Sequence, residues 1–386
     1  MNLFDDNFFI NIAPMPAAGM GMGRFVVRLD GEKVVQLDPH IGFSHRGMEK
    51  IMEQGPILQG LVYVDKLNRS APFSCTHAFV RAVEQLAGIT VPERASYIRV
   101  ILAETGRILS HLRATANLAA ETGTDSVYPL VNRMSERIYA LADELCGTCS
   151  PALFIRPGGV KDDLTPASEK SLSRWLFKEM PPLMAEIEDL LTENRIFKSR
   201  TEGIGKIDGD QATAMGFSGV NLRACGIRYD LRTSEPYEIY DRLSFDIPVR
   251  TTGDCYARYS LRIFEIYQSL RIIRQALEKM PQGEVMSPEF GISDLRSLTQ
   301  LSRHFELYGK GTPLPAGEVY AAVEAPPGEF GVFLVSDGSP EPYRCHFRSA
   351  GFPVMQALSS LTEGRDLADV RVIAASLNMI MTEIDR

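Results

Sequence analysis

The chain has 386 residues, of which 45% are hydrophobic and 23% charged, a balance typical of folded proteins and not of disordered or collagen-like chains. Lys and Arg total 41 against 49 Asp and Glu, and the basic residues are scattered, which argues against nucleic acid as a partner. No stretch offers the roughly 20 apolar residues that a membrane-spanning helix needs. The start carries two Asp and no signal-peptide pattern, so we expect a chain that stays on the cytoplasmic or matrix side.

Six cysteines are spread irregularly, which argues against a disulfide framework and for a reducing compartment. Cys146 and Cys149 form a C-x-x-C pair, but no second pair and no nearby histidine completes a zinc tetrahedron. Two thiols at a helix end are therefore the favoured interpretation, and a redox or metal role is the alternative. The six histidines do not stand at metal-ligand spacing either, so we predict no metal site.

Residues 1–65 are predicted to be strands and turns, the first of three regions. Residues 24–29 alternate between apolar and polar side chains, Asp30-Gly31 is a hairpin turn signal, and residues 33–37 form the return strand. This pattern predicts an N-terminal antiparallel β-sheet.

Residues 66–200 are predicted to be a bundle of long helices with short connections. Apolar residues recur at helical spacing over four segments: 70–87, 90–120, 132–145 and 166–193. Gly88 suits the end of the first, and Thr90-Val-Pro-Glu93 has the pattern of a capping box that opens the second. His77 and His111 lie on these helices, where we expect buried, hydrogen-bonded histidines.

Residues 201–386 begin with an irregular stretch to about residue 250 and continue with a helix over 257–280. Three short strands and a last helix follow, near 319–323, 330–335, 343–347 and from about 353. No repeat or clean linker divides the chain. We therefore expect one α+β unit: an N-terminal antiparallel sheet, a central long-helix bundle and a C-terminal mixed α/β part.

Several motifs resemble one known family. Asp38-Pro-His-Ile-Gly42 and His45-Arg-Gly-Met-Glu-Lys50 are similar to the D-P-H-I-G-x-x-H-R-G-x-E-K signature of the 49-kDa, or D, subunit of NADH:quinone oxidoreductase, respiratory complex I. Further matches in the same order include Ile155-Arg-Pro-Gly-Gly-Val160, Val335-Ser-Asp-Gly338 and the terminal Ile384-Asp-Arg386. The chain is identified by these motifs as a divergent member of that family, which is similar in turn to the large subunit of nickel–iron hydrogenases.

The resemblance implies a peripheral-arm subunit of a respiratory-chain, proton-translocating enzyme that is not catalytic alone. It implies no cofactor on this chain, quinone as substrate, and an iron–sulfur cluster in the partner subunit. The implied partners are that terminal cluster subunit, the 30-kDa or C-type subunit, and membrane-arm subunits. Together they would form the quinone cavity, on the cytoplasmic side of a bacterial inner membrane or the matrix side of the mitochondrial one. The alternative is a complex I-like scaffold subunit with altered or lost quinone reduction.

The hydrogenase nickel lies between two Cys-x-x-Cys pairs, one early and one near the C-terminus. At the matching positions this chain reads Leu67-Asn-Arg-Ser-Ala-Pro72 and Thr382-Glu-Ile-Asp-Arg386. Nickel chemistry is excluded, because such a site requires soft thiolate ligands.

The resemblance also suggests cluster-facing residues, although it assigns no catalytic residue. His45 and Arg46 would face the partner's cluster, where a permanent cation stabilises the reduced state. The alternative for Arg46 is an ordinary ion pair with Glu49 or another acid.

Three residues are expected at the quinone cavity. Met20 stands where the family has a histidine that reaches the quinone, and Arg69 stands where it has a tyrosine. Glu121 occupies the place of an acidic residue that partners this histidine, and its alternative is a solvated carboxylate at a helix end. We expect Arg69 to pair with Glu121 across the cavity.

Overall fold

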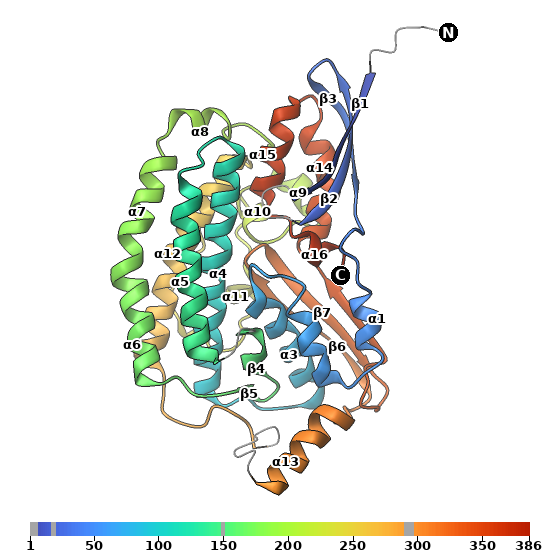
Figure 1. The fold of residues 1–386 in the computed structure, drawn as a ribbon, viewed down its shortest axis with the longest axis vertical. Helices are drawn as coiled ribbons and strands as arrows, with labels where there is room; N and C mark the ends of the chain where they lie inside the picture. Colours follow the sequence, from blue (N-terminus) through green and yellow to red (C-terminus); the bar gives the residue numbers. More distant parts are fainter. Residues whose placement is uncertain (1–6, 17–20, 148–150, 289–296) are drawn as a thin grey trace.

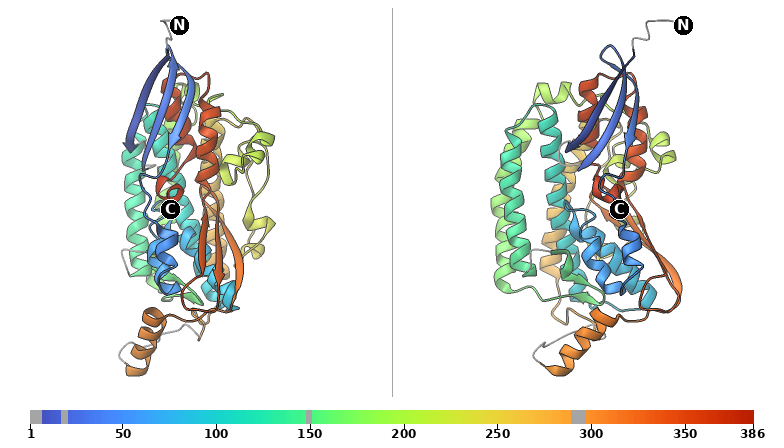
Figure 2. Two further views of the ribbon diagram at one scale, coloured as in Figure 1. Left: turned by 90° about the vertical axis from the view of Figure 1, so that its right-hand side faces the viewer. Right: turned by 45° about the vertical axis from the view of Figure 1, so that its right-hand side comes forward.

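The computed structural model describes residues 7–16, 21–147, 151–288 and 297–386 (Figure 1). Long helices form one side of the molecule, and two three-stranded antiparallel sheets lie on the other side (Figures 1 and 2). The expected α+β class, with an N-terminal sheet, central long helices and a C-terminal sheet with helices, is confirmed.

The N-terminal sheet consists of β1 (Asn7–Pro16), β2 (Met22–Asp30) and β3 (Lys33–His40), hydrogen-bonded in that order. The predicted hairpin is β2–β3, and Gly31 in its turn has a φ of 58°, which favours glycine. Helix α14 (Gly351–Thr362) packs against β3, so the inward side chains of β2 are buried.

The prediction of strands and turns was wrong for residues 48–64, whereas residues 41–47 form turns and coil. Residues 48–64 contain α1 (Met48–Met52), a 3₁₀ turn η1 (Ile57–Gln59) and α2 (Gly60–Val64). These elements are shorter than the roughly 11 residues over which a helical period can be recognised. They are held by tertiary packing, since Met52 and Leu61 are buried in the core.

The predicted long helices are confirmed, with adjusted ends. They are α3 (Pro72–Ala87), α4 (Glu93–Glu121), α5 (Val127–Cys146), α6 (Pro166–Arg174), α7 (Met180–Leu191) and α12 (Cys255–Lys279). Gly88 ends α3 with a φ of 67°, as expected. The capping box was wrong: Pro92 precedes α4 and no side chain caps it.

A π-helical turn, η3 (Trp175–Glu179), joins α6 and α7 into the single helix expected over 166–193. Pro181 and Pro182 lack the N–H groups that would bond the carbonyls of Phe177 and Lys178. Missing donors of this kind explain the wider turn just before them.

The C-terminal sheet contains β6 (Gly317–Ala325), β7 (Gly328–Ser336) and β8 (Arg344–Arg348), close to the predicted strands. The remaining elements are short and connect these layers: β4 (Ile155–Arg156), β5 (Gly159–Val160), α8 (Arg195–Ser199), α9 (Gly209–Ala214), α10 (Gly219–Arg223), α11 (Leu231–Ser234) and α13 (Leu298–Phe305). After α14, the chain ends with α15 (Leu367–Leu377) and α16 (Met381–Ile384). Figure 1 places the C-terminus beside α16, between the N-terminal sheet and α1.

One buried hydrophobic cluster extends from Phe25 on β2 to Ile384 on α16. Within the described residues, no helix is both long and apolar enough to span a bilayer.

Charged side chains are also buried, and many of them form ion pairs. Glu104 of α4 accepts hydrogen bonds from Tyr240 at 2.7 Å and Ser269 at 2.6 Å and pairs with Arg232 at 3.2 Å. Such pairing offsets the cost of burying a charge.

The two helix histidines are buried and hydrogen-bonded, as predicted. His77 Nε2 lies 2.8 Å from Glu238 Oε1, and His111 Nε2 lies 2.9 Å from Glu265 Oε2. Burial lowers the pKa of His111 to about 4, although the hydrogen bond to Glu265 opposes this shift. His111 is therefore neutral near pH 7.

Candidate functional site

Asp385, close to the C-terminal end of α16, holds the loop between β3 and α1. The N–H of Gly42 donates to Asp385 Oδ1 and the N–H of Ser44 donates to Asp385 Oδ2, both at 2.7 Å. Gly42 has a φ of 104°, a conformation that favours glycine and lets both N–H groups converge on one carboxylate. The D-P-H-I-G motif and the terminal I-D-R motif are thus two halves of one structure.

The same contact fixes the orientation of His45. Its Nδ1 lies 2.6 Å from the main-chain carbonyl oxygen of Asp385. Because a carbonyl oxygen only accepts, Nδ1 must carry a hydrogen, and Nε2 is the ring nitrogen that this contact leaves uncommitted. His45 is exposed, so Nε2 is accessible from outside this chain.

Arg46 is exposed beside it and donates from Nη2 to the carbonyl oxygen of Lys66 at 3.0 Å. The alternative ion pair with Glu49 is not formed. Glu49 instead lies 3.0 Å from Arg344, 3.1 Å from His346 and 3.6 Å from Arg386. Across the described ranges no carboxylate lies within ion-pair distance of Arg46.

A hollow of about 400 Å³ opens beside this loop. Its wall is formed by the loop, α1, the first residue of β8, the start of α14 and the C-terminal segment: Ile41, Gly42, His45, Gly47, Glu49, Lys50, Arg344, Phe352, Ile384, Asp385 and Arg386. Of the predicted site residues in the described part of the chain, only His45 lines it.

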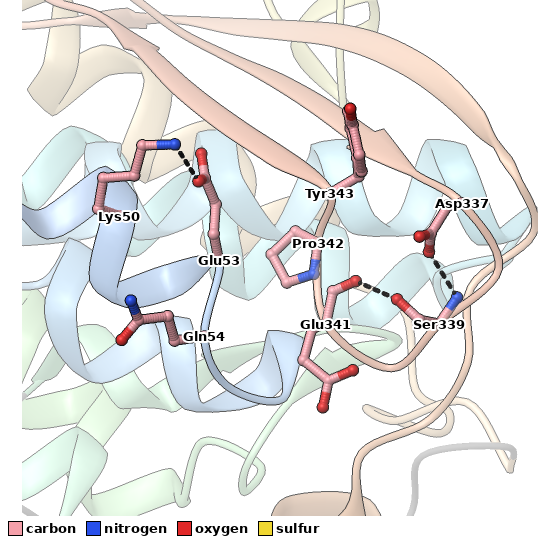
Figure 3. A pocket seen from close by; sticks show the side chains of 8 residues that line it. All are labelled: Lys50, Glu53, Gln54, Asp337, Ser339, Glu341, Pro342 and Tyr343. Atoms are coloured by element: carbon pink, nitrogen blue, oxygen red, sulfur yellow. Dashed lines mark hydrogen bonds and ion pairs between the residues drawn. The ribbon is translucent and has the colours of Figure 1, made fainter.

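A second hollow, also of about 400 Å³, lies between α1 and the turn after β7 (Figure 3). Lys50 donates to Glu53 at 2.6 Å on one wall, and the N–H of Ser339 donates to Asp337 at 3.0 Å on the other. Burial alone would raise the pKa of Glu53, but hydrogen bonds from Lys50 and Arg344 lower it overall. None of the predicted site residues that the structure describes lines this hollow.

The two segments that match the hydrogenase cysteine pairs meet in space. Thr382 Oγ1 donates to the carbonyl oxygen of Leu67 at 2.7 Å, and Asn68 Nδ2 donates to Glu383 Oε2 at 2.8 Å. An amide and a carboxyl group thus stand at this junction, in place of thiolates. No group of three or more His, Cys, Asp or Glu that could hold a metal ion is found among the described residues.

The expected pair of Arg69 and Glu121 is not formed. Glu121, at the end of α4, pairs with Arg371 of α15, with Nε at 2.7 Å and Nη2 at 3.0 Å. The carbonyl oxygen of Arg69 instead accepts from Tyr139 at 3.5 Å, and Tyr139 accepts from Arg113 at 2.9 Å. Arg113 precedes Glu121 by two helical turns, about 12 Å along α4, so the two groups lie at different levels of the bundle.

Arg69 is exposed, and its guanidinium has no ion-pair partner within the described ranges. Met20 and Cys149 lie outside the described residues. Cys146 is buried at the end of α5, and burial raises the pKa of its thiol to about 12, so it is not a reactive thiolate.

Asp385, Asn68, Glu383 and Arg371 were not predicted as site residues. The terminal I-D-R motif was a signal for Asp385, but its contact with residue 45 spans 340 positions. No local pattern could reveal such a contact.

The sequence of this chain is similar to those of proteins of one known family. Residues 121–386 match the family model of the 49-kDa subunit of respiratory-chain NADH dehydrogenase. The chain is 42% identical to the NADH-quinone oxidoreductase D-type subunit of Acidiphilium cryptum, over 99% of this chain and 95% of the relative. It is 44% identical to the proteins of the same name from Brucella anthropi (98% of each chain) and Caulobacter vibrioides (98% and 97%).

These matches define the class as subunits of the respiratory-chain NADH dehydrogenase. Within that class, the chain belongs to the 49-kDa, or D, subunit family of NADH-quinone oxidoreductase, respiratory complex I.

Proposed function

We propose that this chain forms one wall of a quinone cavity, beside a partner subunit that holds the terminal iron–sulfur cluster. In the assembled complex, electrons from NADH pass through the cluster to quinone, and their transfer is coupled to proton translocation. The remaining partners are a 30-kDa or C-type subunit and membrane-arm subunits. The complex lies at the cytoplasmic face of a bacterial inner membrane or the matrix face of a mitochondrial one.

The observation that carries the proposal is the C-terminal clamp. Asp385 holds the loop in which His45 and Arg46 are adjacent and exposed. In the described part of this chain, neither Nε2 of His45 nor the guanidinium of Arg46 is paired with an acid. Such a surface suits a redox centre that gains negative charge, because a fixed guanidinium keeps its charge at all relevant pH values.

On the quinone side, the proposal keeps Met20, Arg69 and Glu121 as cavity residues, with Arg69 and Glu121 acting separately. The exposed guanidinium of Arg69 is suited to stabilise an oxygen that becomes negative on reduction. A guanidinium group is in general a poor proton donor near neutral pH. Met20 offers only a weakly accepting thioether. These residues alone do not deliver the protons that quinol requires.

The second candidate is a scaffold subunit in which quinone reduction is altered or lost. The replacement of the family's histidine and tyrosine by Met20 and Arg69 favours it. The two candidates differ in what the assembled complex does, since both keep the fold and the interfaces.

The test is NADH:quinone reductase activity of the purified complex, with and without a headgroup-site inhibitor. Reduction of a hydrophilic artificial acceptor by NADH serves as a control for the upstream part of the complex. Inhibitor-sensitive turnover supports the cavity role. Intact NADH oxidation without quinone reduction contradicts it and supports the scaffold.

A further inference from the structure

Glu383 is a buried carboxyl group without a cationic partner among the described residues. Its residue is 2% exposed, and it accepts hydrogen bonds from Asn68 Nδ2 at 2.8 Å, Ser349 Oγ at 2.9 Å and the N–H of Ala350 at 3.2 Å. In the part of the chain that the structure describes, no Lys, Arg or His lies within ion-pair distance of its oxygens. All three donors are neutral.

The deeply buried Glu104 and Glu265 have arginine partners, unlike Glu383 within the described ranges. Glu104 has Arg107 at 3.2 Å, and Glu265 has Arg223 at 2.8 Å. Although burial opposes it, the neighbouring arginines lower the pKa of both carboxyl groups, so they are permanent anions near neutral pH. At Glu383 burial dominates and raises the pKa, while the hydrogen bonds from Ser349 and Asn68 only moderate the shift.

Ser349 allows Glu383 to hold or release a proton with no more than a rotation of the serine hydroxyl hydrogen. The Ser349 hydroxyl donates to the carboxylate, and its oxygen also accepts from the N–H of Gly351 at 3.1 Å. Since a hydroxyl hydrogen rotates, the same oxygen can accept from a protonated Glu383. The carboxyl group of Glu383 therefore has a hydrogen-bond partner in both protonation states.

The surroundings of Glu383 contain few other titratable groups. Cys75 of α3 is buried, and its thiol pKa is raised by burial and by the charges of Glu383 and Asp65. Asp65, at the end of α2, pairs with Lys66 at 2.5 Å. Between β8 and α14 the neighbouring groups are the neutral Ser349 and Ala350. On its own segment, Asp385 holds the loop through Gly42 and Ser44.

Its position connects it to the proposed cavity. Asn68 precedes the exposed Arg69, and its Oδ1 accepts from the N–H groups of Ser70 and Ala71, both at 3.0 Å, so the side chain is fixed. The carboxyl group thus lies directly behind the segment that presents Arg69.

We propose that Glu383 is the proton-exchange group of this quinone site, which takes the place of the proton donors that Met20 and Arg69 cannot provide. This inference rests on the proposed function. Quinone receives two electrons from the partner's cluster and two protons. One proton leaves the Glu383 O–H bond and forms an O–H bond on quinone through water at the 67–71 segment, and the second comes from solvent. Glu383 remains as a carboxylate held by its three donors until a solvent proton restores it.

The experiment is redox-induced infrared difference spectroscopy of the whole complex, reduced by dithionite and reoxidised. We expect a signal of a protonated carboxyl C=O stretch that changes with reduction and disappears in Glu383→Gln. Glu53→Gln is the control, because Glu53 is a carboxylate held by Lys50 and Arg344, and it should leave the signal unchanged. A signal that survives in Glu383→Gln, or is absent from the wild type, overturns the proposal.

Turnover provides an independent measurement. Glu383→Gln should lower NADH:quinone reductase activity at least tenfold and flatten its pH profile, with unchanged reduction of a hydrophilic acceptor. Full activity at all pH values overturns the proposal. If Glu383→Gln fails to assemble, Glu383→Asp should retain a shifted carboxyl signal, and its absence counts against the proposal. A wild-type complex that reduces no quinone contradicts the proposed function, whereas the infrared signal still tests Glu383.

Discussion

Glu121 and Arg371, 250 residues apart, join the end of α4 to α15 through two contacts of 2.7 and 3.0 Å. Glu121 is 8% exposed and Arg371 is 50% exposed in their side chains, so the pair is open to solvent on one side. It fixes the acid that the family resemblance places at the quinone cavity.

The first prediction concerns this pair. Glu121→Ala and Arg371→Ala should each lower the thermal inactivation midpoint of the complex. The interaction energy of the pair should be about 1 kcal/mol or less, because the Arg371 side chain is half exposed. The double variant should lose less than the sum of the two. Arg69→Ala and Glu121→Ala should combine additively, and a strong coupling between these two would contradict the structure.

The second prediction concerns the clamp. Asp385→Ala should release the loop at residues 42–45, since two backbone N–H groups lose a charged acceptor, at a cost of roughly 2–4 kcal/mol. Hydrogen exchange of the Gly42 and Ser44 amides should accelerate. Asp366→Ala, which removes an exposed ion pair with Lys33, is the matched control and should leave these amides protected.

The third prediction is that Arg46→Ala lowers the midpoint potential of the partner's terminal cluster. Loss of a nearby positive charge destabilises the more negative reduced state, by on the order of 1 kcal/mol. Arg46→Lys keeps the charge and should retain most of the potential. The midpoint potential is measured by an EPR-monitored redox titration. An unchanged potential in Arg46→Ala would contradict the assignment of Arg46 to the cluster-facing surface.

The fourth prediction concerns acid stability. Because burial lowers the pKa of His111 to about 4, the unfolded chain binds more protons than the folded chain between about pH 6.5 and pH 4. The contribution of His111 to stability is complete above pH 6.5 and decreases as the pH falls to about 4, by on the order of 3 kcal/mol. His111→Gln should flatten the stability–pH curve of the complex over this interval, whereas His304→Gln should not. The same slope in His111→Gln would show that other groups cause it.

The sequence by itself determined the β2–β3 hairpin, the long helices α3, α4 and α12, the absence of nickel ligands and the family. These follow from patterns within a few residues, or from motifs kept in order along the chain. The short helices α1 and α2 could not be predicted, because they contain too few turns to show a period.

The site was decided by the tertiary structure. Periodicity shows which face of an element is buried, but not which distant side chain meets it. The resemblance therefore led us to expect an ion pair between Arg69 and Glu121, whereas in the structure Glu121 pairs with Arg371. The tertiary structure likewise brings Asp385 to His45 and Glu383 to Asn68. Helix α16 packs against the loop and the 67–71 segment, and the polar groups buried there need hydrogen-bond partners.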